Sequence, residues 1–161
     1  MTTGDWLDCQ PAACLETSLS DVREIGMQVE QEVSIVIIGR NEEGSISHCF
    51  EAAIAAAEQI GGAEMIYVDS RSTDNTVSIA EKYGFRSVIL PPEIRLSPSA
   101  GRYIGSQTAR GDLILFIDAD TLVYKDFLPT AIDLFNLDSS LGGCNGRIDD
   151  FTESGEPVSD V

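Results

Sequence analysis

The chain has 161 residues, of which 43% are hydrophobic, and these values are typical of one globular domain and not of a disordered chain. Its 27 acidic residues outnumber its 10 Lys and Arg, and the net charge of -17 argues against nucleic acid or an anionic membrane as main partner. One phosphorylated ligand remains compatible with this charge, because a bound divalent cation reverses the local field.

The first 31 residues show no sustained period and predict a flexible arm. They lack the basic-then-apolar layout of a secretion signal. No apolar stretch approaches the roughly 18 residues that a membrane-spanning helix needs. We therefore expect a cytoplasmic protein whose contact with a membrane, where it has one, is peripheral. The cysteines lack zinc-site spacing and are expected to be reduced thiols: Cys9, Cys14, Cys49 and Cys144.

An alternation of short apolar runs and helical patterns begins at Val33. Residues 33–38 are nearly all apolar and mostly β-branched, which predicts a central parallel strand. From Glu42 the apolar residues recur with a helical period until Gly61 and Gly62, which can adopt the left-handed conformation of a helix end. A second strand is predicted at 65–68.

The strand and helix patterns then repeat as far as residue 148. The further predicted helices occupy 72–83, 99–110 and 125–137, and the further strands occupy 87–90, 113–117 and 142–148. Strands that alternate with helices indicate an α/β fold with a mostly parallel sheet flanked by helices. We therefore expect one domain at 32–148, followed by an acidic, loop-like tail at 149–161.

Polar residues follow three of the predicted strands. Asn41, Asp69 and Asp118 each come at or just after a strand's carboxyl end. Ligands of open parallel sheets bind at that edge, near a switch in strand order. This convergence predicts a binding site there.

Asp118-Ala119-Asp120 is the strongest candidate within that site. A two-residue spacing in extended chain points both carboxylates the same way, and hard oxygen ligands suit Mg²⁺ or Mn²⁺. Ala119 leaves room for a ligand. The alternative is that the two aspartates cap a turn and a helix, but their position after the buried run 113–117 favours a metal site.

The other candidates have competing structural interpretations. Asp69 is expected to contact a ligand, whereas Asp74 is expected to cap the next helix. Arg102 fits a diphosphate contact and a salt bridge equally well. The only histidine, His48, is expected to be a solvated helix residue and not a general base. Arg71 is a loop residue with a weaker claim.

Several other enzyme classes lack their motifs. No G-x-S-x-G follows a strand, and no P-loop occurs. Gly39 stands alone after the first strand, so the dinucleotide fingerprint is absent too.

Three ordered elements resemble family-two glycosyltransferases of the GT-A fold. The run V-S-I-V-I-I-G-R-N-E-E at 33–43 resembles the family's opening, and V-D-S-R-S-T-D-N-T at 68–76 is similar to its D-D-G-S-T-D-x-T element. The run A-R-G-D-L-I-L-F-I-D-A-D-T at 109–121 resembles its D-A-D block. The resemblance extends over about residues 33–128 and implies a GT-A, Rossmann-like fold.

The resemblance also implies that a nucleoside-diphosphate sugar binds as donor. Asp69 would then contact the base, Asp118 the ribose or a metal-bound water, and Asp120 a divalent cation, Mn²⁺ or Mg²⁺. Arg102 matches the arginine of the family's A-R-N element, although Tyr103 follows it where Asn is usual. The donor-binding set implied by the resemblance also includes Gly39, Asn41, Glu42 and Ala119, with Gly39 in place of a common Pro.

The family's reaction is a direct displacement with inversion, in which a carboxylate base deprotonates the acceptor. That base normally lies well downstream of D-x-D, and no convincing counterpart occurs before Val161, so we expect an incomplete GT-A unit that retains the donor half. The acceptor, whether a saccharide, a lipid carrier or a small molecule, is not identified. Two alternatives stay open: a catalytically incomplete nucleotide-sugar-binding or scaffold domain, and a nucleotidyltransferase.

Overall fold

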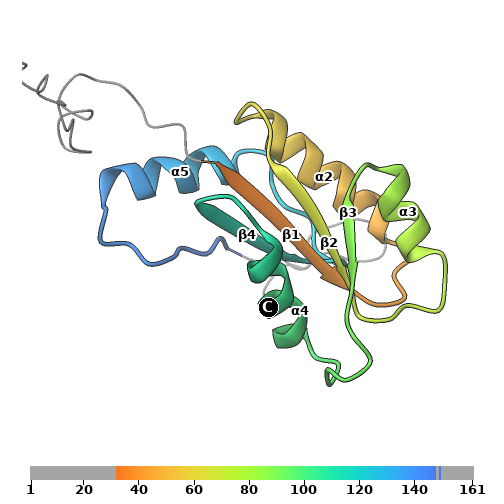
Figure 1. Cartoon of the computed structure of the whole chain (residues 1–161). Coiled ribbons are helices and arrows are strands. Elements are labelled where there is room, and N and C mark those ends of the chain that lie inside the picture. The colour runs from red at the N-terminus through yellow and green to blue at the C-terminus, as the bar shows by residue number, and fades with distance from the viewer. Residues whose placement is uncertain (1–31, 148, 150–161) are drawn as a thin grey trace, which may run out of the picture. The chain divides into compact units, whose positions relative to one another are not determined.

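The computed structural model describes residues 32–147 and residue 149. Within this part, four strands form one sheet in the order β3-β2-β1-β4 (Figure 1). They are β1 (Val33–Gly39), β2 (Glu64–Asp69), β3 (Arg86–Ile89) and β4 (Leu113–Asp118). Every adjacent pair is parallel, which confirms the predicted parallel sheet.

The order of the strands changes direction at β1. The chain moves outward from β1 to β2 and β3, and then returns to place β4 on the other side of β1. Gly39 is the register partner of Asp69, and Ile38 is the partner of Asp118. The carboxyl ends of the three strands therefore meet at one edge, beside the switch point where α/β proteins bind ligands.

Helices cover both faces of the sheet (Figure 1). They are α2 (Ile46–Glu58), α3 (Thr76–Lys82), α4 (Pro98–Thr108) and α5 (Phe127–Leu137). Because side chains alternate along a strand, Ile35 and Ile37 belong to the core with α2, whereas Val36 and Ile38 pack on the opposite face with α4. The apolar run that predicted β1 is thus buried on both sides.

Helix α4 approaches β1 closely through two glycines. A β-carbon on Gly105 would lie 2.3 Å from Cγ1 of Val36, and one on Gly101 would lie 3.2 Å from Cγ2 of Ile38. The small residues at this four-residue spacing face the sheet together, since residues i and i+4 share one side of a helix. Because these glycines let α4 lie close to β1, Arg102, which follows Gly101, comes near the carboxyl edge of the sheet.

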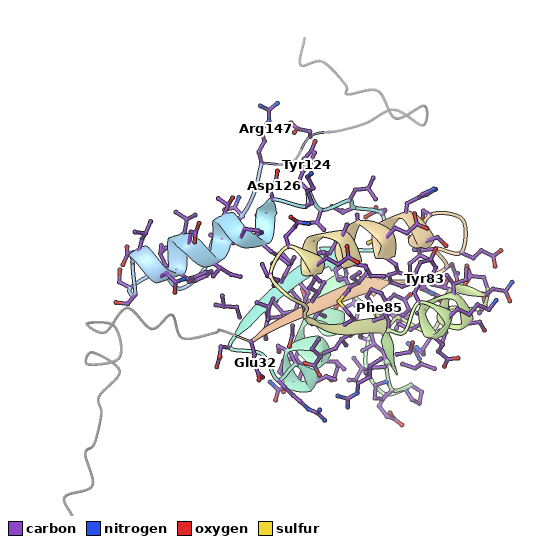
Figure 2. All side chains as sticks on the ribbon, turned by 90° about the horizontal axis from the view of Figure 1, so that it is seen from above. Glu32, Tyr83, Phe85, Tyr124, Asp126 and Arg147 are labelled. Atoms are coloured by element: carbon purple, nitrogen blue, oxygen red, sulfur yellow. The ribbon has the colours of Figure 1, made fainter. Side chains whose placement is uncertain are left out.

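An aromatic cluster fills the other face. The ring of Phe50 stacks on Phe85 with centroids 4.1 Å apart and meets Tyr67 edge-on at 5.8 Å. Tyr83 also contacts Phe50, and Figure 2 shows Tyr83 and Phe85 beside α2. These contacts join α2, β2 and the end of α3 into one core.

The predicted fifth strand is wrong for residues 142–147, which have no regular secondary structure and are almost all exposed. A β-carbon added to Gly142 or Gly143 would meet nothing within 4 Å, so no neighbouring strand covers them. Gly146 lies against the ring of Phe127, and Figure 2 shows Arg147 near the start of α5. Ile148 lies outside the described residues.

Smaller differences concern helix ends. Helix α4 begins at Pro98 and ends at Thr108, because Ala109 already has extended backbone angles. Helix α2 begins at Ile46, after the turn that starts at Glu42. The expected arm at 1–31 and the tail at 150–161 lie outside the described residues. In the part that the structure describes, no helix is both long and apolar enough to cross a membrane.

Candidate functional site

A cavity of about 390 Å³ opens at the carboxyl edge of the sheet. The end of β1, the residues after β2, the start of α4 and the Asp118-Ala119-Asp120 segment line it. Glu42, Asp118 and Asp120 are the acidic residues of this lining, and Arg40 is its basic residue. The cavity therefore combines charged and apolar side chains and lies at the switch point.

The Asp118-Ala119-Asp120 segment continues from β4 along the end of β1. The backbone N–H of Ala119 donates to the carbonyl of Ile38 at 2.9 Å, and Ala119 is buried. Thr121 donates its N–H to the carbonyl of Asp118, which turns the chain. Ala119 thus anchors the segment against β1, while the carboxylates on either side of it both line the cavity.

The thiol of Cys49 lies beneath this segment. It contacts the carbonyl oxygen of Asp118 at 3.8 Å from helix α2. Burial, and then the charges of Asp120 and Asp118, raise the pKa of Cys49 to about 12. Burial therefore favours the protonated thiol. This confirms the expectation of a buried free thiol.

Arg102 reaches Asp118 from helix α4. Its Nη2 donates to Oδ1 of Asp118 at 2.7 Å, and the two side chains are 41% and 47% exposed, respectively. The salt-bridge interpretation of Arg102 is confirmed, and its contact with a diphosphate stays a prediction.

Asp69 is buried, with 1% of its surface exposed. Its Oδ1 accepts hydrogen bonds from the hydroxyls of Tyr67 and Ser72, and its Oδ2 accepts one from the N–H of Ser72 at 2.8 Å. Burial and the Asp69 charge raise the pKa of Tyr67, so the phenol stays a donor. The carboxylate therefore fixes the turn after β2, directly beside Gly39 at the end of β1.

The loops after β1 and β2 are tied together. The N–H of Asn41 donates to Oγ of Ser72, and the amide oxygen of Asn41 accepts from the N–H of Thr73 at 2.8 Å. The N–H of Glu42 donates to the hydroxyl of buried Thr76. Asn41 adopts a left-handed conformation with φ 56°, which Asn tolerates better than most residues. These bonds fix the position of Asn41 and Glu42 relative to Asp69.

Asp74 and Glu43 extend this connection to helix α3. Asp74 accepts from the N–H of Thr76, the first residue of α3, as expected of a capping carboxylate. Its other oxygen accepts from the N–H of Glu43, whose own carboxylate accepts from Asn75. The pKa of Asp74 is held below its usual value, and the largest cause is the hydrogen bond from the Thr76 hydroxyl.

Arg71 has a role that its sequence context did not predict. It adopts φ 60°, which is rare for a long side chain, and donates to the carbonyls of Pro92 and Ile94. Arg71 thereby holds the loop before α4, which supplies one wall of the cavity. The sequence carries no signal for a left-handed Arg.

The polar lining residues that the sequence did not single out as candidates are Arg40, Ser70 and Ser97. Ser97 caps α4, since its Oγ accepts from the N–H of Ala100 at 3.1 Å, and Pro98 follows it. Ser followed by Pro is a helix-start signal that could have been read from the sequence. His48 is exposed on α2, as expected.

The sequence of the chain matches that of a known family. Residues 34–157 match the sequence model described as Glycosyl transferase family 2. The chain belongs to this family. The match confirms the resemblance and favours a glycosyltransferase over a nucleotidyltransferase.

Two curated relatives illustrate the similarity. The chain is 31% identical over 101 residues to a poly(ribitol-phosphate) beta-glucosyltransferase of Bacillus spizizenii, covering 60% of this chain and 16% of the relative. It is 34% identical over 105 residues to an undecaprenyl-phosphate 4-deoxy-4-formamido-L-arabinose transferase of Shewanella sediminis, covering 62% of this chain and 32% of the relative. The chain thus spans less than a third of either relative.

Solved structures show the same GT-A, Rossmann-like architecture. Staphylococcus aureus TarS matches with a TM-score of 0.58 at 24% identity, over 76% of this chain and 24% of that one. Mycobacterium tuberculosis glucosyl-3-phosphoglycerate synthase, solved with Mn²⁺, uridine diphosphate and glucosyl-3-phosphoglycerate, matches with a TM-score of 0.52 at 26% identity. That match covers 64% of this chain and 39% of the synthase.

Proposed function

We propose that this chain carries the donor site of an inverting, metal-dependent glycosyltransferase. The observation that carries the proposal is that Asp118, Asp120 and Glu42 line one cavity at the switch point of a family-two sheet, with Arg102 at its edge. A nucleoside-diphosphate sugar is the ligand whose chemistry uses a cation site and an arginine together.

The residues beside Asp69 would form the nucleoside end of the site. Asp69 is buried and lies outside the cavity lining, so it would act on the nucleoside indirectly, by holding the turn that carries Ser70 into the lining. Asn41 holds the loop that carries Glu42 into the lining, and Gly39 lets Ala119 lie against the end of β1. The diphosphate would then lie between this end and Ala119.

Asp118 and Asp120 fit a divalent cation. Both line the cavity, one on either side of the buried Ala119. Among residues 32–147 and 149, no three His, Cys, Asp or Glu side chains could surround a metal by themselves. Mg²⁺ and Mn²⁺ tolerate this, because they take water and phosphate oxygens as further ligands.

A cation held there would supply Lewis-acid stabilisation of the departing diphosphate. Arg102 would add charge-assisted hydrogen bonds to the same phosphates. Inversion also needs a carboxylate base on the acceptor side. The acidic residues that line the cavity are all assigned to the donor, so we place the base outside the described residues.

Calorimetry tests the donor site. Uridine, guanosine and thymidine diphosphates are titrated with Mn²⁺ into the chain, into Asp120→Asn and into Asp112→Asn. Asp112 is exposed before β4, at the opposite edge of the sheet, so its variant makes the same charge change far from the cavity. We expect one nucleotide to bind in a metal-dependent way, and only Asp120→Asn to weaken that binding, by about tenfold or more.

Absence of metal-dependent binding, or equal binding by both variants, would reject the donor site. A second candidate, a binding domain without turnover, is favoured by the lack of a base in the described lining. Release of sugar from uridine-diphosphate glucose or uridine-diphosphate N-acetylglucosamine, measured with and without Mn²⁺, separates the two. Turnover that Asp120→Asn abolishes excludes the binding-only alternative.

A further inference from the structure

The salt bridge between Arg102 and Asp118 places a cation where the proposed metal would bind. Nη2 of Arg102 donates to Oδ1 of Asp118 at 2.7 Å, and Asp118 is also a proposed ligand of the divalent ion. One carboxylate oxygen cannot keep a close guanidinium and a close divalent cation with equal strength, because the two positive charges repel each other.

The salt bridge is suited to exchange. The side chains of Arg102 and Asp118 are 41% and 47% exposed, so water can replace either partner as it leaves. Exposed salt bridges are weak: forming one changes the equilibrium constant of the process that it accompanies by about two- to fivefold. Arginine also stays charged at all relevant pH values, so the pair is broken by competition and not by titration.

The charges around the cavity determine which ligand can displace Arg102 from Asp118. Glu42, Asp118 and Asp120 line the cavity, whereas Arg40 is its only lining cation, with Arg102 beside it on Asp118. A diphosphate that arrives alone meets this excess of negative charge. A diphosphate that arrives with a divalent cation neutralises the aspartates and offers Arg102 a new anion.

Arg102 has the means to reach that anion. It lies one turn into α4, whose N-cap Ser97 and first residue Pro98 line the cavity. A guanidinium has five N–H donors, and its planar fork matches phosphate as well as carboxylate. The side chain of Arg102 is 41% exposed, so a change of rotamer is the movement that would redirect it.

We propose that Arg102 couples the two ligands of this site, by neutralising Asp118 in the empty site and transferring to the diphosphate when the cation and the nucleotide bind. This inference rests on the proposed donor function. It predicts that the cation and the nucleotide bind cooperatively, and that Arg102 is a source of the cooperativity. The site thereby selects the metal–diphosphate complex over the free metal ion.

The test measures Mn²⁺ affinity by electron paramagnetic resonance, alone and with saturating uridine diphosphate or uridine. Arg102→Met removes the charge and keeps an unbranched side chain, and Arg102→Gln is a second neutral variant. Arg86→Met is the matched control, because Arg86 pairs with Glu64 at the amino edge of the sheet. Thermal unfolding checks that each variant is folded.

We expect both Arg102 variants to bind Mn²⁺ alone about two- to fivefold more tightly than the parent, with no such change in Arg86→Met. The factor by which uridine diphosphate tightens Mn²⁺ binding should fall by a similar amount, and reciprocity requires the same fall in the effect of Mn²⁺ on the nucleotide. Uridine, which has no phosphate, should leave Mn²⁺ affinity unchanged in every variant.

Two outcomes would overturn the coupling role. Mn²⁺ affinity that is unchanged or weaker in both Arg102 variants would show that Arg102 does not compete for Asp118. An unchanged coupling factor would show that the cooperativity has another source. If the parent binds neither Mn²⁺ nor any nucleoside diphosphate, the donor function itself fails, which is a result distinct from these two.

Discussion

The β-carbon that Gly39 lacks would lie 2.6 Å from the β-carbon of Ala119. This contact joins the end of β1 to the centre of the Asp118-Ala119-Asp120 segment. The segment can lie flat against β1, with the Ala119 N–H bonded to Ile38, because residue 39 has no side chain. The spacing between the two strand ends thus depends on one missing methyl group.

Gly39→Ala should therefore disturb the site and not only the core. The added methyl group overpacks a buried contact, so we expect the free energy of unfolding to fall by roughly 1–3 kcal/mol. Displacement of Ala119 should also weaken metal-dependent nucleotide binding by about tenfold, because ligand geometry tolerates little movement. Urea denaturation and calorimetry measure the two effects.

Gly44→Ala is the control, because a β-carbon there would meet nothing within 4 Å. It should change the free energy of unfolding by no more than about 0.5 kcal/mol, and it should leave nucleotide affinity unchanged. Adding Ala119→Gly to Gly39→Ala should restore part of the lost stability, since it removes the opposing methyl group. Equal effects of Gly39→Ala and Gly44→Ala would show that the contact does not constrain the segment.

Ser72→Ala tests the link between the two donor loops. The Ser72 hydroxyl donates to Asp69 and accepts from the N–H of Asn41, so its loss leaves a buried carboxylate oxygen and a backbone donor each short of one partner. We expect a loss of roughly 1–3 kcal/mol in the free energy of unfolding. Ser78→Ala, on the exposed face of α3, should have almost no effect. Similar losses in the two variants would contradict this role.

Much of the frame could be predicted from the sequence, because strand patterns report burial directly. The apolar runs before Asp69 and Asp118 mark strands that end at the ligand edge. The expected burial is found in β2, but in β4 only Ile117 is buried and Phe116 is 37% exposed, because no further strand or helix of the described residues covers that edge of the sheet as fully. The same reasoning was wrong at 142–147. An apolar residue among glycines predicted a strand there, but no neighbouring strand in the part of the chain that the structure describes pairs with this segment. A strand needs a partner, and a local pattern does not report one.

The details of the site could not be predicted in the same way. The bonds from Asn41 and Ser72 join residues that lie 31 positions apart in the sequence, and they depend on a left-handed Asn41. The pairing of Arg102 with Asp118 depends on the close approach of α4, which Gly101 and Gly105 permit. Such contacts follow from tertiary packing and have no local signal.

Arg71→Gly should separate two effects of this residue: the strain of its left-handed backbone, and the hydrogen bonds by which its side chain holds the loop before α4. Glycine adopts φ 60° without strain, which stabilises the variant. The loss of the hydrogen bonds to Pro92 and Ile94 destabilises it. We expect a small net change in global stability, within about 1 kcal/mol. Amide hydrogen exchange at residues 93–97 should become faster, while that of α2 stays the same. Unchanged exchange at 93–97 would show that Arg71 does not hold the loop.

Glu64, at the amino edge of the sheet, gives a prediction for acid stability. Its carboxylate accepts from the hydroxyl of Ser34 at 2.7 Å and from the N–H of Arg110 at 2.8 Å. The Ser34 hydrogen bond is the main cause that holds the pKa of Glu64 below its usual 4.5. Because the folded-state pKa is the lower one, this stabilisation is complete above the unfolded value and is lost as pH falls through the folded value.

Glu64→Gln keeps an oxygen acceptor but cannot titrate. The difference in unfolding free energy between the parent and this variant should be constant above pH 5 or so and should shrink as pH falls below about 4.5. Glu58→Gln, at an exposed position at the end of α2, should follow the parent at every pH. Urea denaturation of the three proteins across this range measures the difference. A difference between parent and Glu64→Gln that stays flat on acidification would mean that the ionised carboxylate does not stabilise this edge, and that the Ser34 and Arg110 donors are equally well satisfied by an uncharged acceptor.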